Sequence, residues 1–461
     1  MKILLVAYEF APSASPQSLR WQYLCAELSA LGHEVRVLAP DSPAYHAAGL
    51  PNLPADVEVR RTFAGPFHGL LRAKQKRKEA DARGSAARVP AEAGAQVDRH
   101  AGLAVDVAVG SAPADSLPAA NPQVEELNWK GVLWHAGLNW KGRVFQALQS
   151  CAAYIIYPDL RGEWLPWARR GLIRELDSFK PDVVVTSHEP ATTLLLGMSA
   201  KRLGYRWVAD IGDPICAPYT PQRWRSRALR LERTVCRSAD LITVTADSVC
   251  RLMQERHSRD RGMLVISQGF DGRIRSAGKA ERRAGAPLEM LYTGSFYKFR
   301  APDELVAAVI ATPGIRLTVA SINPPDSVRL AAKEHPEAIR LIGFQPHAQA
   351  LRMQRDADVL VNIGNDLPDQ VPGKIYEYLG AGKPILHLSS GIDDGALGIL
   401  KRTARAIAVR NAREELAGVL GKLLACDDVA TTFGLDLSPQ RVEEFSWEAS
   451  ARRLAERLQL I

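Results

Sequence analysis

The stretch DLPDQVPGKIYEYLGAGKPILHL, from Asp366 to Leu388, holds the pattern around which the rest of the chain is organised. A loop with two prolines leads into a short predicted helix over Lys374–Leu379. Gly380 and Gly382 are expected to end this helix, because glycine readily adopts the left-handed conformation that closes a helix. A buried strand is predicted to start at Pro384, so the stretch predicts a loop–helix–strand unit.

Four residues of this stretch combine the chemistry of an anion site with that of a diol site. Gly373 and Lys374 stand at the helix start, where backbone N–H groups and an ammonium attract an anion. Asp369 in the loop and Glu377 on the helix place two carboxylates around the same helix start. Amides and an ammonium suit a phosphate, and a carboxylate suits a ribose diol. The pattern therefore predicts a phosphorylated, hydroxyl-rich ligand.

Length and composition indicate a globular protein of two domains. With 461 residues the chain exceeds the size at which a single core usually stops growing. The formal charge of +8 and the pI near 9.2 leave nucleic acid, an anionic membrane surface or a phosphorylated small substrate as partners. Because no aromatic–basic nucleic-acid module is visible, we favour the last two and expect no nucleic acid.

Cysteine use and hydropathy favour the cytoplasm. The six cysteines are scattered and form no CxxC pair, which fits a reducing compartment and argues against a disulfide framework or a zinc ribbon. The apolar run after Met1 is too short for a signal peptide, and no apolar run approaches the roughly 18 residues of a membrane span. We therefore predict a cytoplasmic protein.

The first of two series of alternating strands and helices begins at the amino terminus. It opens with an apolar strand over Lys2–Ala7, a loop of small residues over Glu9–Pro16, a helix over Gln17–Leu31 and a strand over Glu34–Ala39. This is the start of a Rossmann-like domain, which is expected to span residues 1–271. Its loop lacks GxGxxG, so the pattern does not favour a dinucleotide.

A second series follows a linker. Residues 272–287 are polar, basic and interrupted by glycine and proline, which is typical of a linker. The second Rossmann-like series spans 288–444, and residues 445–461 contain a predicted last helix from Trp447 to Leu460. The predicted fold class is α/β, with two Rossmann-like doubly wound domains facing across a cleft.

Residues from about 65 to 150 interrupt the first series. Arg72–Asn121 is rich in Ala, Arg and Gly and poor in large apolar residues, so we interpret it as a flexible or loosely helical insertion. In Leu127–Leu148 the segment LNWKG occurs twice, with Trp134 between the copies. Tryptophans beside lysines are typical of a helix at lipid headgroups, and the alternative is a helix packed over the sheet edge. Peripheral contact with an anionic membrane is therefore a prediction.

Fragments spread along the chain together resemble one enzyme family. They include GHEVRVLAP, KPDVVVTSHEP, LERTVCRSADLITVTADS, LYTGSF and DQVPGKIYEYLGAGKPIL. Their order resembles that in retaining GT-B glycosyltransferases of the glycosyl transferases group 1 family (glycosyltransferase family 4-like), over all but roughly residues 65–150. The resemblance implies a nucleotide-sugar donor on the second domain, an acceptor on the first, retention of anomeric configuration, and no required metal or cofactor. It also implies that the last helix crosses back onto the first domain.

The resemblance assigns the donor site first to the opening stretch. Glu377 matches the second acid of the family's paired-acid motif and is expected to bind the ribose hydroxyls. Asp369 falls at the first acid, a candidate catalytic position near the donor sugar, where the family normally has glutamate. Gly373 and Lys374 belong to the same expected donor-binding set.

The resemblance also places the donor diphosphate after the first strand of the second domain. Lys298 and Arg300 are the expected cations, and Gly294 permits close approach. Ser295 stands where the family usually has arginine. Fixed cations there would stabilise the charge that builds on the leaving diphosphate, so Lys298 is also a candidate catalytic residue.

Three residues of the first domain complete the expected site. His188 follows a predicted strand directly, where the family has a histidine near the donor sugar, and is a candidate catalytic residue. Asp213 and Arg20 are expected to bind the acceptor. The alternatives are a structural histidine at 188 and a turn cap at 213.

The predicted function is a hexosyltransferase that uses a UDP- or GDP-sugar. Its acceptor would be a lipid-linked or polysaccharide precursor in cell-envelope or exopolysaccharide biosynthesis. Asp369 and Ser295 motivate a first alternative, a catalytically silent scaffold in a polysaccharide-assembly complex. A sugar-nucleotide epimerase of the same fold is the second alternative.

Overall fold

A computed structural model of the chain describes residues 1–13, 15–42, 50–86, 158–218, 220–273, 285–297, 301–365, 371–389 and 394–461. Met1–Gly69 together with Ile156–Ile461 form one compact unit, and Leu70–Ile155 form a second. The description of the second unit covers only its helical residues up to Ala86. The predicted interfacial helix over Leu127–Leu148 lies outside the described residues. Within the described ranges, no helix combines the length and apolar character needed to cross a bilayer.

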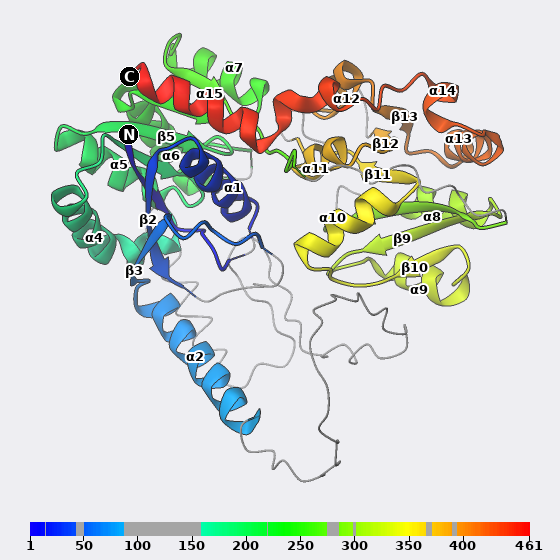
Figure 1. Ribbon diagram of the computed structural model, residues 1–461, viewed down its shortest axis with the longest axis horizontal. Coiled ribbons are helices and arrows are strands. Elements are labelled where there is room, and N and C mark those ends of the chain that lie inside the picture. The colour runs from blue at the N-terminus through cyan, green and yellow to red at the C-terminus, as the bar shows by residue number, and fades with distance from the viewer. Residues whose placement is uncertain are drawn as a thin grey trace, which may run out of the picture. The chain divides into compact units, whose positions relative to one another are not determined.

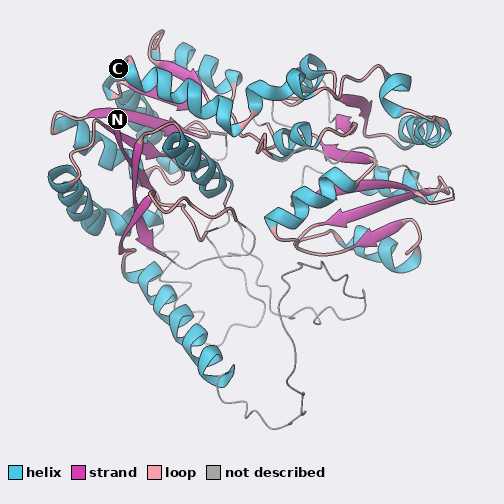
Figure 2. Cartoon of the chain, in the orientation of Figure 1, coloured by secondary structure: helices cyan, strands magenta, loops and turns pink. Residues whose placement is uncertain are grey.

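A parallel sheet of seven strands forms the core of the amino-terminal half (Figures 1 and 2). Its strands lie in the order β3-β2-β1-β4-β5-β6-β7. The strands are β1 (Lys2–Ala7), β2 (Glu34–Asp41), β3 (Glu58–Phe63), β4 (Val183–Ser187), β5 (Arg206–Ile211), β6 (Leu241–Val244) and β7 (Met263–Val265). Every residue of β4 and β6 is buried, as expected for a parallel sheet covered on both faces.

Helices cover both faces of this sheet. One face packs against α1 (Pro16–Ala30) and α15 (Trp447–Gln459), and the other against α4 (Leu165–Ser178), α5 (Thr192–Arg202), α6 (Gln222–Ser238) and α7 (Asp247–His257). Alternate side chains of β1 serve the two faces: Ile3 and Leu5 point to the first, Leu4 and Val6 to the second. Helix α2 (Pro66–Ala86) follows β3, and the 3-10 helix η1 (Leu160–Trp164) precedes α4.

A second parallel sheet has six strands in the order β10-β9-β8-β11-β12-β13. They are β8 (Leu288–Thr293), β9 (Ile315–Ala320), β10 (Ile339–Leu341), β11 (Val359–Ile363), β12 (Ile385–Ser389) and β13 (Ala406–Arg410). One face packs against α8 (Asp303–Ile310), α9 (Asp326–Glu334) and α13 (Arg413–Ala425); the other packs against α10 (His347–Asp356), α11 (Lys374–Ala381) and α12 (Leu397–Thr403). Short helices α14 (Val429–Phe433) and η2 (Pro439–Phe445) follow. The predicted α/β class with two Rossmann-like sheets is confirmed.

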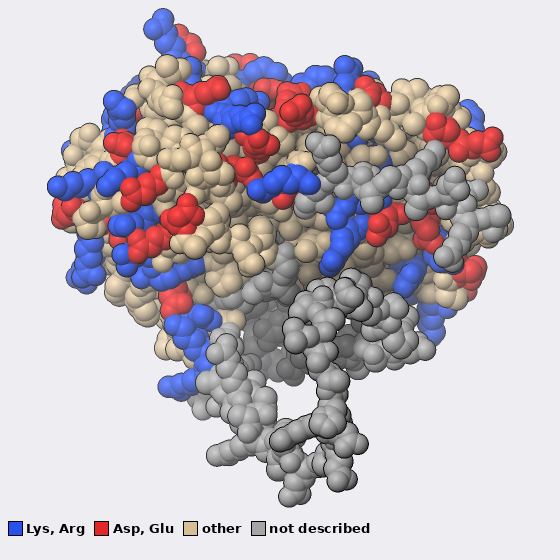
Figure 3. All heavy atoms as spheres, viewed as in Figure 1, with Lys and Arg blue, Asp and Glu red and all other residues tan. Residues whose placement is uncertain are grey.

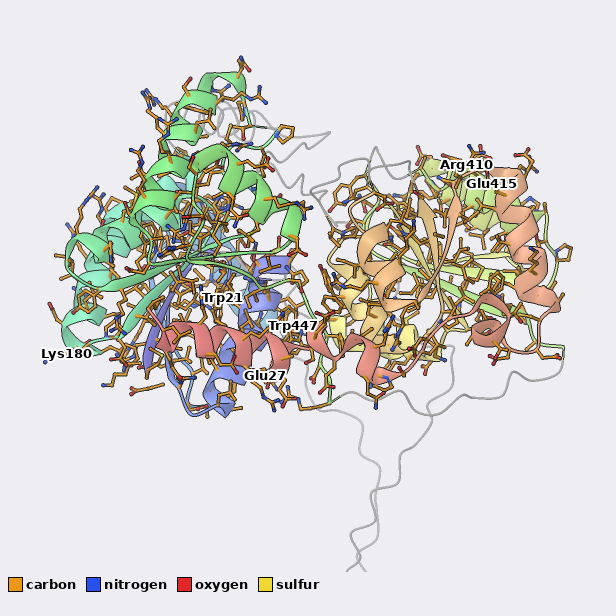
Figure 4. The ribbon with its side chains drawn as sticks, turned by 90° about the horizontal axis from the view of Figure 1, so that it is seen from above. Trp21, Glu27, Lys180, Arg410, Glu415 and Trp447 are labelled. Atoms are coloured by element: carbon orange, nitrogen blue, oxygen red, sulfur yellow. The ribbon has the colours of Figure 1, made fainter. Side chains whose placement is uncertain are left out.

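The last helix, α15, belongs to the core of the first sheet. Trp447 and Leu454 are buried in the same cluster as Trp21 of α1. Figure 4 shows Trp21 and Trp447 where α1 and α15 lie alongside each other. The ring of Trp447 stacks on Tyr23 with centroids 5.4 Å apart. Ser446 caps the helix by accepting from the N–H of Ala449, so the chain enters α15 in a fixed direction.

Helix α11 ends later than the sequence predicts. Gly380 lies inside the helix, so the prediction that it helps to end the helix is wrong. The helix ends at Gly382, which has a left-handed φ of +69°. Gly380 is needed for packing instead, because a Cβ at this position would overlap the ring of Phe270.

Five elements have no counterpart among the predicted ones: α7, α12, β13, α14 and η2. Their apolar patterns are weak. Only Val249 and Met253 are buried in α7, and β13 alternates between buried or half-buried and exposed positions. Conversely, α2 is a continuous helix of 21 residues that enters the stretch expected to be flexible or loosely helical.

Candidate functional site

The strand order reverses at the same place in both sheets. In the first sheet β1 pairs with β2 on one side and β4 on the other; in the second sheet β8 pairs with β9 and β11. Ligands of open α/β sheets bind outside the carboxyl ends of the strands at such a reversal. The residues that follow β1 and β4, and those that follow β8 and β11, are therefore the candidate site.

Glu377 is the central acid of the second sheet's candidate site. It lies in the first turn of α11 and is 8% exposed. Its Oε2 accepts from Lys374 Nζ at 2.7 Å and from Gln354 Nε2 at 3.2 Å. Burial alone would raise the pKa of Glu377, but Lys374, His347 and the two hydrogen bonds outweigh it and lower that pKa. The carboxylate is therefore ionised near neutral pH.

A buried hydrogen-bond network connects Glu377 to the end of β8. Gln354 on α10 donates to Glu377 and also to Thr293 Oγ1 at 3.1 Å. The hydroxyl of Tyr378 accepts from the backbone N–H of Thr293 at 2.9 Å. Thr293 is followed by Gly294, whose φ of +145° favours glycine. The network thus fixes the predicted diol-binding acid relative to the predicted diphosphate turn.

The start of α11 also lies close to residues of the first sheet. Gly373 is the N-cap of α11, and a Cβ there would lie 3.3 Å from Cγ of Gln268, which follows β7. His347 Nδ1 lies 4.0 Å from Glu377 Oε1, and its Nε2 lies 3.4 Å from the hydroxyl of Tyr23 on α1. Burial lowers the pKa of His347. His347 thus lies between the carboxylate of Glu377 and helix α1.

Three predicted site residues lie outside the described residues: Asp369, Lys298 and Arg300. Their expected roles remain predictions. The structure brings Gly373, Lys374 and Glu377 together at the start of α11.

His188 follows β4 directly and is 6% exposed. Its backbone N–H donates to the carbonyl oxygen of Asp210 at 2.7 Å, which holds it at the end of the sheet. Burial lowers the pKa of His188 to about 4, so the imidazole is neutral at neutral pH. Among the described residues its Nδ1 has no hydrogen-bond partner. A neutral imidazole with an unsatisfied nitrogen at a strand end is suited to meet a ligand hydroxyl.

Carboxylates that follow strands of the first sheet meet one arginine of the 3-10 helix η1. Arg161 Nη2 donates to Glu9 Oε1 at 3.0 Å, and Ser13 Oγ donates to Glu9 Oε2 at 3.0 Å. Glu189, just after β4, has a φ of +69°, which non-glycine residues adopt mainly where the surrounding structure imposes it. Burial and then the charge of Asp213 raise the pKa of Glu189 to about 7. Its carboxyl can therefore donate or accept a hydrogen bond near neutral pH.

Glu9, Arg161 and Glu189 are not among the predicted site residues. A positional signal exists for the two acids, because each is the second residue after an apolar strand, β1 or β4. Arg161 carries no such signal: it meets Glu9 only through the fold. His347 and Gln354 were missed for the same reason, since they lie on α10 and reach Glu377 across a helix–helix contact.

Arg20 is enclosed by the protein. Its side chain is 1% exposed, and Nη1 donates to Asp210 Oδ2 at 2.6 Å while Nη2 donates to the carbonyl of Ile266 at 2.9 Å. Trp21 Nε1 and Thr243 Oγ1 complete the partners of Asp210. This arrangement ties α1 to the centre of the sheet, and the predicted acceptor contact of Arg20 stays a prediction.

A surface cavity of about 450 Å³ lies away from these strand ends. It is lined by Cys236, Arg237, Asp240 and His257–Gly262, which precede β6 and β7. Arg259 in this cavity donates to four backbone carbonyls and is held by the fold. Because ligands of open α/β sheets bind at the carboxyl ends of strands, this cavity at the amino ends is not the candidate site.

Comparison with known proteins gives one family match and many structural matches. Residues 83–269 match the model of the glycosyl transferase 4-like domain. No curated protein matched the sequence. No three His, Cys, Asp or Glu residues in the described ranges are grouped to hold a metal ion.

The structural matches span the whole chain. Sucrose-phosphate synthase from Thermosynechococcus elongatus covers 100% of this chain and 98% of its own, with 15% identity and a TM-score of 0.62. HepE from Anabaena, solved in complex with UDP, covers 100% of both chains, with 11% identity and a TM-score of 0.59. WaaG, a glycosyltransferase involved in lipopolysaccharide biosynthesis, covers 98% of this chain and 95% of its own, with 13% identity and a TM-score of 0.51. The chain thus has the GT-B fold, and its residues 83–269 are similar to a glycosyl transferase 4-like domain.

Proposed function

We propose that the chain is a hexosyltransferase that moves a sugar from a UDP- or GDP-sugar to a lipid-linked or polysaccharide precursor in cell-envelope or exopolysaccharide biosynthesis. One observation carries the proposal: Glu377, ionised and nearly buried, stands beside Lys374 at the start of α11. A carboxylate for the ribose diol and a cation for the phosphate would then stand together near the carboxyl ends of the second sheet's strands, where open α/β sheets bind ligands. The complex of HepE with UDP supports the nucleotide part of the donor.

On the donor side, Glu377 would accept hydrogen bonds from the two ribose hydroxyls. Lys374 and the backbone of Gly373 and Gly294 would face the diphosphate, together with Lys298 and Arg300. Asp369 would lie near the sugar. These cations would stabilise the charge that builds on the diphosphate when the sugar–oxygen bond breaks.

On the acceptor side, the hydroxyl would lie against the ends of β4 and β5, near His188 and Asp213. The acceptor oxygen would attack the anomeric carbon from the face that the diphosphate leaves, and its proton would pass to the departing phosphate. Configuration is then retained, and no metal or other cofactor enters the step. We place the protein in the cytoplasm, in peripheral contact with the inner face of the cell membrane.

Binding and product analysis test the proposal in two steps. Calorimetry with UDP, GDP and ADP should show one preferred nucleoside diphosphate; binding of none of them would refute the donor site. Incubation of the matching nucleotide sugars with acceptor extracts should then give a glycosylated product, whose anomeric configuration is read by NMR. Donor binding without transfer or hydrolysis would favour the scaffold alternative, and a changed sugar with donor alone would favour the epimerase.

A further inference from the structure

Helix α6 carries a stripe of five exposed arginines. Arg223, Arg227, Arg230, Arg233 and Arg237 are all exposed. At 3.6 residues per turn these positions fall within an arc of about 120° on the side opposite the buried Ala228 and Val235. With a rise of 1.5 Å per residue the stripe is about 21 Å long. We call this set the arginine stripe.

No acid balances the arginine stripe on its own helix. Glu232 is the one acidic residue of α6, and it is 0% exposed. Its carboxylate is occupied by Arg256 Nη1 at 2.8 Å, His257 Nε2 at 2.6 Å and the backbone N–H of Cys216 at 3.0 Å. Glu232 thus holds the loop before α6, and its charge does not reach the stripe. Within the described part of the chain, Arg230, Arg233 and Arg237 form no ion pair.

The charge pattern differs on the face shown in Figure 3. There, Lys and Arg lie among Asp and Glu, as on an ordinary soluble surface. A row of one sign over about 21 Å is instead suited to a continuous anionic surface. Guanidinium groups bind phosphate with paired N–H donors, so lipid phosphates fit the stripe.

The surroundings of α6 favour a membrane over nucleic acid as the partner of the stripe. Trp224 is half-buried on the side of α6 that carries Val235, and the guanidinium carbons of Arg223 and Arg227 lie 5.6 and 5.0 Å from its ring centroid. The aromatic ring thus supports the first turn of the stripe from the protein side. The loop from Gly212 to Pro221, which carries the predicted acceptor residue Asp213, leads directly into α6.

We propose that the arginine stripe of α6 docks the protein on an anionic phospholipid bilayer. This inference rests on the proposed membrane contact and assigns it to a described helix, whereas the sequence points to the insertion at about residues 65–150. A stripe that lies on the bilayer next to the acceptor loop would bring a lipid-linked acceptor to the ends of β4 and β5. Vesicle binding needs neither donor nor acceptor. An absence of vesicle binding would therefore refute the membrane proposal without bearing on the proposed transferase activity, which product analysis tests.

Vesicle sedimentation tests the arginine stripe against a charge-matched control. In the stripe variant all five arginines are replaced by glutamine, which keeps helix propensity. The control replaces five exposed arginines elsewhere by glutamine and so changes the net charge equally: Arg329, Arg340, Arg352, Arg402 and Arg413. Both variants are first compared with the wild type by circular dichroism and thermal melting.

The wild type should bind vesicles with about 30% phosphatidylglycerol in phosphatidylcholine and release from them at about 1 M NaCl. Each basic side chain on such a surface contributes about fivefold to partitioning, so the stripe variant should bind at least roughly 100-fold more weakly, and the control within about threefold of the wild type. Wild-type binding to pure phosphatidylcholine, equal binding of the two variants, or no wild-type binding would overturn the proposal. Tighter, stripe-dependent binding to a duplex DNA or RNA oligomer would assign the stripe to nucleic acid instead.

Discussion

Replacement of Glu377 by glutamine removes the charge at the proposed diol site and little else. Glutamine has nearly the same volume, and its amide oxygen can still accept from Gln354 Nε2, now 3.2 Å from the carboxylate. Lys374 is 36% exposed, so its ion pair with Glu377 contributes little to folding, about 0–1 kcal/mol. The unfolding free energy of Glu377→Gln should therefore stay within about 1 kcal/mol of the wild type, as measured by urea denaturation.

Ligand binding should change far more than stability. A hydrogen bond to a charged acceptor contributes about 1.5–3 kcal/mol, so Glu377→Gln should weaken binding of the preferred nucleoside diphosphate by roughly 10-fold to 150-fold. Calorimetry with the ribose form and its 2′,3′-dideoxy form completes the cycle. The wild type should bind the ribose form more tightly than the dideoxy form by a similar factor. The variant should distinguish the two forms by less than about threefold, because the hydrogen bonds between the ribose hydroxyls and the carboxylate are already lost.

Glu289→Gln is the matched control. Glu289 is also paired with a cation, Arg316 at 3.0 Å, but it lies near the amino end of β8, away from the strand ends that form the site. Its replacement should leave both ligand affinities unchanged. If Glu377→Gln still preferred the ribose form as strongly as the wild type does, Glu377 would not be the diol acceptor and the reasoning would be refuted.

Three further predictions concern stability. Burial and the charge of Asp213 raise the pKa of Glu189 from 4.5 to about 7, so the protonated carboxyl stabilises the fold by at most about 3 kcal/mol. This stabilisation is fully present below pH 4.5 and is lost as the pH rises through 7. The melting temperature of Glu189→Gln, relative to that of the wild type, should therefore rise between about pH 5 and about pH 8, and a constant difference would contradict this. Gly380→Ala should lower the unfolding free energy by about 1–3 kcal/mol, because the new methyl group would overlap the ring of Phe270. Gly418→Ala, which has open space around the new Cβ, should instead raise the unfolding free energy by about 0.5–1 kcal/mol. Urea denaturation measures both changes. Arg20→Met leaves a buried carboxylate unpaired and should cost about 3–5 kcal/mol in the same assay; wild-type stability would contradict a structural role.

The parts of the fold that local pattern determines were predictable. Buried parallel strands appear as short apolar runs, and the alternation with helices gave both sheets. Helix ends were less predictable, as Gly380 shows. A glycine is needed inside α11 because the ring of Phe270, more than a hundred residues earlier in the chain, packs against this position, and no local pattern contains that contact.

The same difference between local pattern and tertiary packing explains which residues of the candidate site the sequence predicted. Lys374 and Glu377 lie one turn apart on α11, so their pairing is a local property that the sequence contains. Whether Glu377 is ionised depends in addition on Gln354 and His347, which α10 brings to it through tertiary packing.

The first sheet repeats this argument with the opposite electrostatic result. Glu189 also follows a strand end, but its strongest charged neighbour is another acid, Asp213, and its pKa rises where that of Glu377 falls. The buried Glu377 and the half-buried Glu189 therefore differ in proton affinity because of the residue that the fold places beside each. An ionised acid at the second sheet suits a diol, whereas the raised pKa of Glu189 at the first lets its carboxyl donate as well as accept a hydrogen bond.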